Sequence, residues 1–265
     1  MSIDPYLSLE AAAAGIRKGD FTSVELTETC LARIDAFGDR LNCIAGADPE
    51  TALADAADAD ALLATGKPVG PLHGVPLAHK DMYYREGRVS ACGAIIRKDY
   101  QPTTTATALH RLDAAGALDI ARLNMVEFAL GPTGHNQHTG AVRNPWNTDH
   151  ITGGSSSGSG SAVAAGLAFG ALGSDTGGSI RTPSACCGLV GMKPTYGRVS
   201  RAGAMPLSFS LDHVGPLTRT VRDNALMLQA VAGSDPRDPT TSHLPVLDFL
   251  EGIEKDIRGL RIAVC

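Results

Sequence analysis

The order of apolar and polar positions predicts helices that alternate with short buried strands. Residues 21–37 give the clearest helix, because Thr22 and Glu25 form a capping box ahead of a broad apolar face. Apolar residues at helical spacing predict three more helices, at 48–66, 104–116 and 220–233, each of which ends at a glycine. Short apolar runs at 42–46, 74–79, 117–121, 169–175 and 188–192 predict strands. This alternation favours a layered α/β domain.

The last residues suggest that the sheet continues. Residues 257–265, IRGLRIAVC, have the pattern of a buried strand that has just begun. We therefore expect more polypeptide to follow Cys265.

Composition excludes several classes of protein. The chain has 265 residues, of which 43% are hydrophobic, and its net charge is −5 without a basic cluster. We therefore expect no nucleic acid to bind to this chain alone. The N-terminus lacks the pattern of a secretory signal, and the longest small-apolar stretch, at residues 162–173, is too short to cross a membrane. The six cysteines form no C-x-x-C pair, which favours a reduced, cytoplasmic protein.

The serine- and glycine-rich run at residues 153–161 allows several interpretations. It has the composition of a flexible linker, but the next segment, SAVAAGLAFGALG, has the pattern of a packed helix and strand. A phosphate loop would need lysine where Ser159 stands. A nucleophile elbow fits G-x-S-x-G centred on Ser156, although the residues before it are polar rather than strand-forming.

A fourth interpretation combines this run with a lysine base and a second glycine–serine loop. Lys80 follows the apolar run at 74–79, and a lysine with a lowered pKa can activate a serine hydroxyl. Ser179 follows Gly177 and Gly178, and the successive amides of residues 176–179 could bind a developing oxyanion. The interpretation thus predicts one site built from three distant segments.

These pieces together resemble the amidase signature family. The matching segments, in the order of the family, are GVPLAHKD, NMVEFALG, RNPWN, GGSSSGS, GSDTGGSIR, CGLVGMKPTYGRVS and SLDHVGPLTRTV. The resemblance implies a mixed β-sheet core surrounded by α-helices. It implies a single domain over residues 1–265, in which the helices of about 1–65 pack on a core at 66–265 that is incomplete at its C-terminus.

The resemblance also assigns roles to residues. Lys80 matches the general base, Ser155 the bridging serine that follows a cis peptide bond, and Ser179 the nucleophile. The remaining matches are the oxyanion hole at Thr176, Gly177, Gly178 and Ser179, the supporting residues Ser156, Asp175 and Arg181, and Ala129 in the substrate pocket. We expect no cofactor, and no metal either, because His135 and His138 lack a third ligand at suitable spacing.

Two kinds of enzyme share these motifs. We expect a stand-alone amidase that acts on a small-molecule amide, in a chain that could form a homodimer. The alternative is the amidase (glutaminase) subunit of a tRNA-dependent amidotransferase, which works with partner chains. An inactive, truncated amidase is a third possibility.

Overall fold

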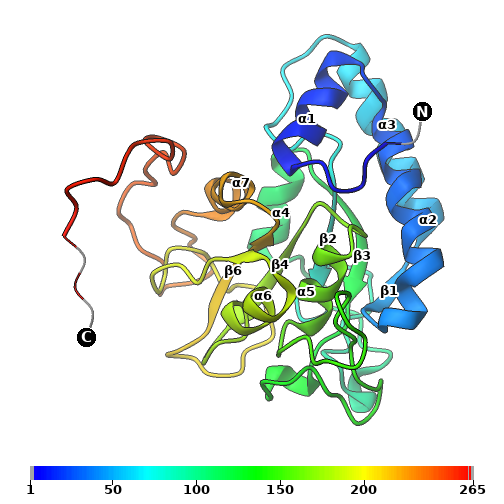
Figure 1. The fold of residues 1–265 in the computed structure, drawn as a ribbon, viewed down its shortest axis with the longest axis vertical. Coiled ribbons are helices and arrows are strands. Elements are labelled where there is room, and N and C mark those ends of the chain that lie inside the picture. The colour runs from blue at the N-terminus through cyan, green and yellow to red at the C-terminus, as the bar shows by residue number, and fades with distance from the viewer. Residues whose placement is uncertain (1–2, 262, 264–265) are drawn as a thin grey trace.

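A single six-stranded sheet forms the centre of the computed structural model, which describes residues 3–261 and 263 (Figure 1). The strands lie in the order β1-β3-β2-β4-β6-β5. Strand β2 is parallel to β3 and β4, whereas the other neighbouring pairs are antiparallel. The strands are β1 (Ile44–Ala47), β2 (Pro76–Lys80), β3 (Leu118–Leu123), β4 (Gly170–Asp175), β5 (Val190–Gly191) and β6 (His213–Thr218). The predicted mixed sheet is confirmed.

Helices surround this sheet. In Figure 1, α1 (Leu9–Lys18), α2 (Ser23–Leu41) and α3 (Pro49–Ala64) gather on one side of the molecule, in blue and cyan. Helix α4 (Thr107–Ala114) packs against α7 (Val221–Val231), and α5 (Ser157–Ala164) packs against α6 (Arg181–Cys187) and against β2, β3, β4 and β6. Short 3-10 turns occupy Ile95–Arg97 and Glu127–Ala129.

The parallel pairing of β2 and β4 determines where the site lies. Ala78 pairs with Ala171 and His79 with Leu172, so the two strands run side by side in the same direction. Because the carboxyl ends of parallel strands meet at one edge of a sheet, Lys80 at the end of β2 lies beside the end of β4. The chain continues from β4 directly into the second glycine–serine loop at 176–179.

Most of the predicted elements are confirmed. All four predicted helices and all five predicted internal strands are present, and Thr22 and Glu25 form the expected reciprocal capping box. The pattern did not reveal α1, α6 or β6. Helix α6 is only seven residues long, and β6 contains Gly215 and Pro216, which both disfavour strands in isolation. Strand β6 forms because β4 and β5 pair with it on both sides.

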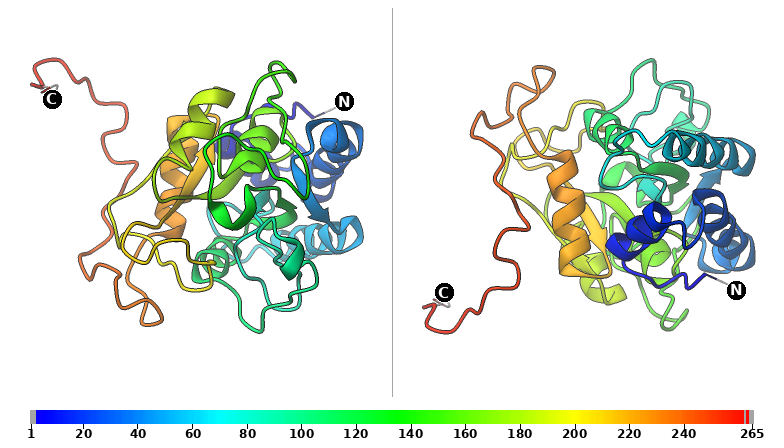
Figure 2. Two further views of the ribbon diagram at one scale, coloured as in Figure 1. Left: turned by 90° about the horizontal axis from the view of Figure 1, so that it is seen from below. Right: turned by 90° about the horizontal axis from the view of Figure 1, so that it is seen from above.

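The C-terminal segment leaves the body of the molecule as an extended trace, red in Figures 1 and 2. The strand predicted over 257–265 is absent from residues 257–261, of which 258 and 259 form a turn, and Ile262, Val264 and Cys265 lie outside the described residues. Leu260 is 68% exposed, so this apolar run is not packed here. Among the helices of the described residues, none has the length and apolar character needed to cross a membrane.

Candidate active site

The serine-rich run is buried, which rules out the linker interpretation. Every residue from 152 to 163 is buried, and helix α5 begins within the run at Ser157. A Cβ atom on Gly154 would lie 2.7 Å from the carbonyl oxygen of Gly131, so this position has no room for a side chain. The peptide bond between Gly154 and Ser155 is cis, as the resemblance implies.

Lys80 is a buried lysine at the centre of the site. Its side chain is 1% exposed, and Nζ lies 2.7 Å from the hydroxyl oxygen of Ser155 and 2.8 Å from that of Ser174. No salt bridge to Lys80 is present in the described part of the chain. Burial lowers the pKa of Lys80 to about 7, although Cys92, Asp175 and Asp212 act in the opposite direction. A large share of Lys80 is therefore neutral near pH 7.

Ser174, whose hydroxyl contacts Lys80, is a site residue that the sequence analysis did not identify. It is the second-to-last residue of β4, and it has no motif of its own that points to chemistry. The signal that could have found it is the pairing of β2 with β4. That pairing places Ser174, the residue before Asp175, next to the Nζ atom of Lys80.

The hydroxyl of Ser156 is committed to the backbone of β4. Ser156 is fully buried, its Oγ donates to the Ser174 carbonyl at 3.2 Å, and it accepts from the Ser174 amide at 3.2 Å. The Ser156 amide donates to the Ser179 carbonyl at 3.3 Å, which ties the two glycine–serine segments together. This geometry is that of a supporting residue and disfavours the nucleophile elbow.

The loop from Thr176 to Ser179 offers free backbone donors. Within the described residues, the amides of Gly177, Gly178 and Ser179 have no protein acceptor. Gly178 has φ of +146°, a conformation that favours glycine, while Gly177 is exposed with open space around its Cα. Ser179 is half-buried, and it is the hydroxyl-bearing end of this row of amides.

An ion pair anchors the far end of that loop. Arg181 donates from Nε and from one terminal nitrogen to the fully buried carboxylate of Asp175, both at 3.0 Å. The amide of Ile180 donates to the same carboxylate at 3.2 Å. Burial raises the pKa of Asp175, but these donors outweigh it and hold the pKa below its usual value. Asp175 and Arg181 thus close the loop that carries Ser179.

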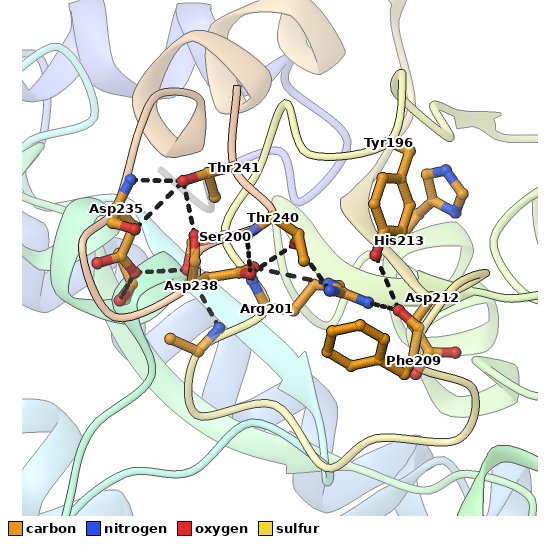
Figure 3. A network of polar contacts seen from close by, with 12 residues as sticks. Tyr196, Ser200, Arg201, Phe209, Asp212, His213, Asp235, Asp238, Thr240 and Thr241 are labelled. Carbon is orange, nitrogen blue, oxygen red and sulfur yellow. Dashed lines mark hydrogen bonds and ion pairs between the residues drawn. The ribbon is translucent and has the colours of Figure 1, made fainter. Parts of the chain in front are cut away.

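A cavity of about 240 Å³ lies next to Ser174. Its apolar wall includes Met82, Met205 and Phe209. Arg201 also lines it, but Figure 3 shows that side chain directed at Thr240, Asp238 and the Phe209 backbone. The Arg201 charge is therefore neutralised within the protein, and the cavity offers mainly apolar contacts to a ligand.

Ala129 does not line this cavity. It is 3% exposed and has φ of +63°, in a turn whose Val126 amide donates to the Ser155 carbonyl at 3.2 Å. The turn is thus joined to Ser155 through its backbone, and a contact between Ala129 and substrate stays a prediction. No group of three metal-ligating side chains is found among the residues that the structure describes.

Comparison with known proteins identifies the family of this chain. The sequence matches the family described as Amidase over residues 25–265. The chain belongs to the amidase family. The family resemblance inferred from the motifs is therefore confirmed.

Relatives within this family differ in their printed roles. The chain is 47% identical over 257 residues to a glutamyl-tRNA(Gln) amidotransferase subunit of Methylococcus capsulatus, covering 97% of this chain and 53% of that protein. The peptide amidase of Stenotrophomonas maltophilia matches with a TM-score of 0.86 at 38% identity, over 91% of this chain and 51% of that one.

A further solved structure belongs to a complex described as vestigial and linked to the origins of an s-triazine catabolic enzyme. It matches with a TM-score of 0.93 at 40% identity, over 96% of this chain and 56% of that one. The chain spans about half the length of the relatives it matches. The curated relatives reported at 47% identity are named as glutamyl-tRNA(Gln) amidotransferase subunits, not as stand-alone amidases.

Proposed function

We propose that this chain carries the catalytic serine–serine–lysine centre of an amidase that hydrolyses a carboxamide through an acyl-enzyme on Ser179. The observation that carries the proposal is the buried Lys80, whose Nζ lies 2.7 Å from the Ser155 hydroxyl without a carboxylate to fix its charge. A neutral lysine in that position can accept a proton, and the Ser155 hydroxyl can relay it.

The reaction proceeds in two stages. In the first, Ser179 Oγ forms a bond to the amide carbonyl carbon while its proton passes through Ser155 to Lys80. The free amides at Gly177, Gly178 and Ser179 stabilise the oxyanion. The C–N bond then breaks, and the proton returns through Ser155 to the departing amine or ammonia. In the second stage, water attacks the acyl carbon and gives up a proton through Ser155 to Lys80. The bond to Ser179 Oγ then breaks, Ser179 Oγ takes that proton back through Ser155, and the carboxylic acid is released.

The names of the relatives favour a function in which this chain is one component of an amidotransferase. We propose glutamine as the amide donor, with the released ammonia used by an acceptor substrate that partner chains bind, because the curated relatives are named as components of amidotransferases. A stand-alone amidase is the second candidate. The fold similarity to a peptide amidase, with a TM-score of 0.86, favours it, as does the largely apolar cavity beside Ser174.

Ammonia release separates these candidates. We would measure it from L-glutamine and from benzamide, for the chain alone and for the polypeptide with any coding sequence that continues past Cys265, with and without co-expressed partner chains. Release from glutamine that rises with the partners supports the amidotransferase component, and release from benzamide alone supports the stand-alone enzyme. Ser179→Ala is the control and should abolish either activity. Turnover that survives Ser179→Ala would contradict the proposed mechanism.

A further inference from the structure

The carboxylate of Asp212 joins two loops that lie 36 residues apart in the sequence. Its Oδ1 accepts a hydrogen bond from the Thr176 hydroxyl at 2.5 Å. Its Oδ2 accepts from the amides of Leu207 and Ser208, at 2.8 Å and 2.9 Å. The Asp212 residue is 8% exposed, so these bonds are largely shielded from water.

The two loops have different tasks under the proposed function. Thr176 begins the row of amides that ends at Ser179, while Met205, Pro206 and Phe209 flank the Asp212-bound amides and line the cavity beside Ser174. The bonds to Leu207 and Ser208 alone would be an ordinary turn within one loop. The bond to Thr176 goes beyond that, because it makes the position of the oxyanion loop depend on the wall of the cavity.

We propose that Asp212 and Thr176 form a clasp that positions the oxyanion loop relative to the cavity beside Ser174, so that Asp212 is a positioning residue for the acylation of Ser179. The inference rests on the proposed function. Asp212 touches neither Lys80 nor Ser155 through a hydrogen bond, and it acts through Thr176. A substrate that packs on the Phe209 wall is thereby held in a fixed relation to the amides that stabilise its oxyanion.

The charge of Asp212 predicts a second observable effect, on the pH dependence of the reaction. Cys92, Asp175 and Asp212 are the groups that raise the pKa of Lys80 against the lowering effect of burial. Asp212→Asn removes the Asp212 charge, so the pKa of Lys80 falls and the rise in labelling rate with pH moves to lower pH. Thr176→Val breaks the same clasp but keeps the charge, so its pH profile stays in place.

The test measures how fast a fluorophosphonate probe modifies Ser179. In this reaction Ser179 Oγ bonds to phosphorus and fluoride departs, while Lys80 receives the proton through Ser155. We expect Thr176→Val to slow labelling about tenfold, less than the ~10²–10³-fold loss typical of removing an oxyanion donor. Thr176→Ser keeps the hydroxyl and should restore the rate.

Thr107→Val is a matched control. The Thr107 hydroxyl also donates to a carboxylate, that of Asp235, at 2.5 Å, but this pair lies outside the oxyanion loop. It should lower the melting temperature without slowing the labelling. The clasp is overturned if Thr176→Val labels as fast as the unmodified chain, or if Thr107→Val slows the labelling as much as Thr176→Val does. If Ser179 of the unmodified chain is not labelled at all, the proposed function fails and the clasp fails with it.

Discussion

Two glycine- and serine-rich segments of this chain look alike in sequence but differ in burial and in hydrogen bonding in the structure. The run at 153–161 is fully buried, and its Ser156 hydroxyl is bonded on both sides to the backbone of Ser174. The loop at 176–179 is partly exposed, and its amides at Gly177, Gly178 and Ser179 have no acceptor within the described residues. The comparison shows that the first segment is packed inside the protein and carries the Ser155 hydroxyl beside Lys80, while the second leaves backbone donors unpaired.

The difference arises from position relative to strand β4. The first segment passes into α5, which packs against β2, β3, β4 and β6, and the hydroxyls of Ser156, Ser159 and Ser161 donate to backbone carbonyls of the protein. The second segment follows the end of β4 at the sheet edge, where the next secondary structure begins only at Arg181. Both segments are rich in glycine and hydroxyl-bearing residues, and the fold distinguishes the packed Ser156 from the partly exposed Ser179.

The largest effect on activity is expected from substitution of Lys80, the proposed base. Lys80→Met keeps most of the side-chain volume but removes the proton acceptor, so we expect kcat/KM on the identified amide to fall by about 10²–10⁴.

In the unmodified chain the folded pKa of about 7 means that neutral Lys80 accumulates as pH rises through that value. The rate should therefore rise and level off above about pH 8. A rate independent of pH between 6 and 8 would contradict a lysine base; these pH limits are roughly one unit either side of the pKa.

A matched pair of glycine substitutions sharpens the comparison within the second segment. Gly178 has φ of +146°, and a Cβ there would lie 2.9 Å from the Thr182 hydroxyl, whereas a Cβ on Gly177 meets nothing within 4 Å. We expect Gly178→Ala to lower kcat about 10²-fold by displacing the amides, and Gly177→Ala to have a smaller effect. Steady-state kinetics on both variants checks this. Equal losses would mean that the loop geometry is not set by Gly178.

A smaller effect is expected in the first segment, on stability. Ser156→Ala removes the hydroxyl that bonds to both the amide and the carbonyl of Ser174, and leaves these buried backbone groups unpaired. We expect a loss of about 1–3 kcal/mol in the free energy of unfolding. Urea denaturation measures it. A variant as stable as the unmodified chain would show that these two bonds contribute nothing to folding.

The sequence alone predicted most of the framework and part of the site. Helical spacing and the capping box at Thr22 and Glu25 located α2, and apolar runs located β2 and β4. The predicted proximity of Lys80 and Ser155 came from family resemblance rather than from spacing, since 75 residues separate them. Strand β6 and the partners Ser174 and Asp212 were missed because each depends on pairing between distant segments, which local patterns do not encode.

The location of the covalent adduct tests the central claim most directly. A serine-directed fluorophosphonate modifies only an activated hydroxyl, because an ordinary serine is a poor nucleophile. Fragment-ion mass spectrometry after digestion can distinguish the two segments. We predict one adduct, on Ser179, that is lost in Lys80→Ala and in Ser155→Ala. An adduct on Ser156, or labelling of Ser179 that persists without Lys80, would contradict the assignment of the first segment as support and the second as the reactive loop.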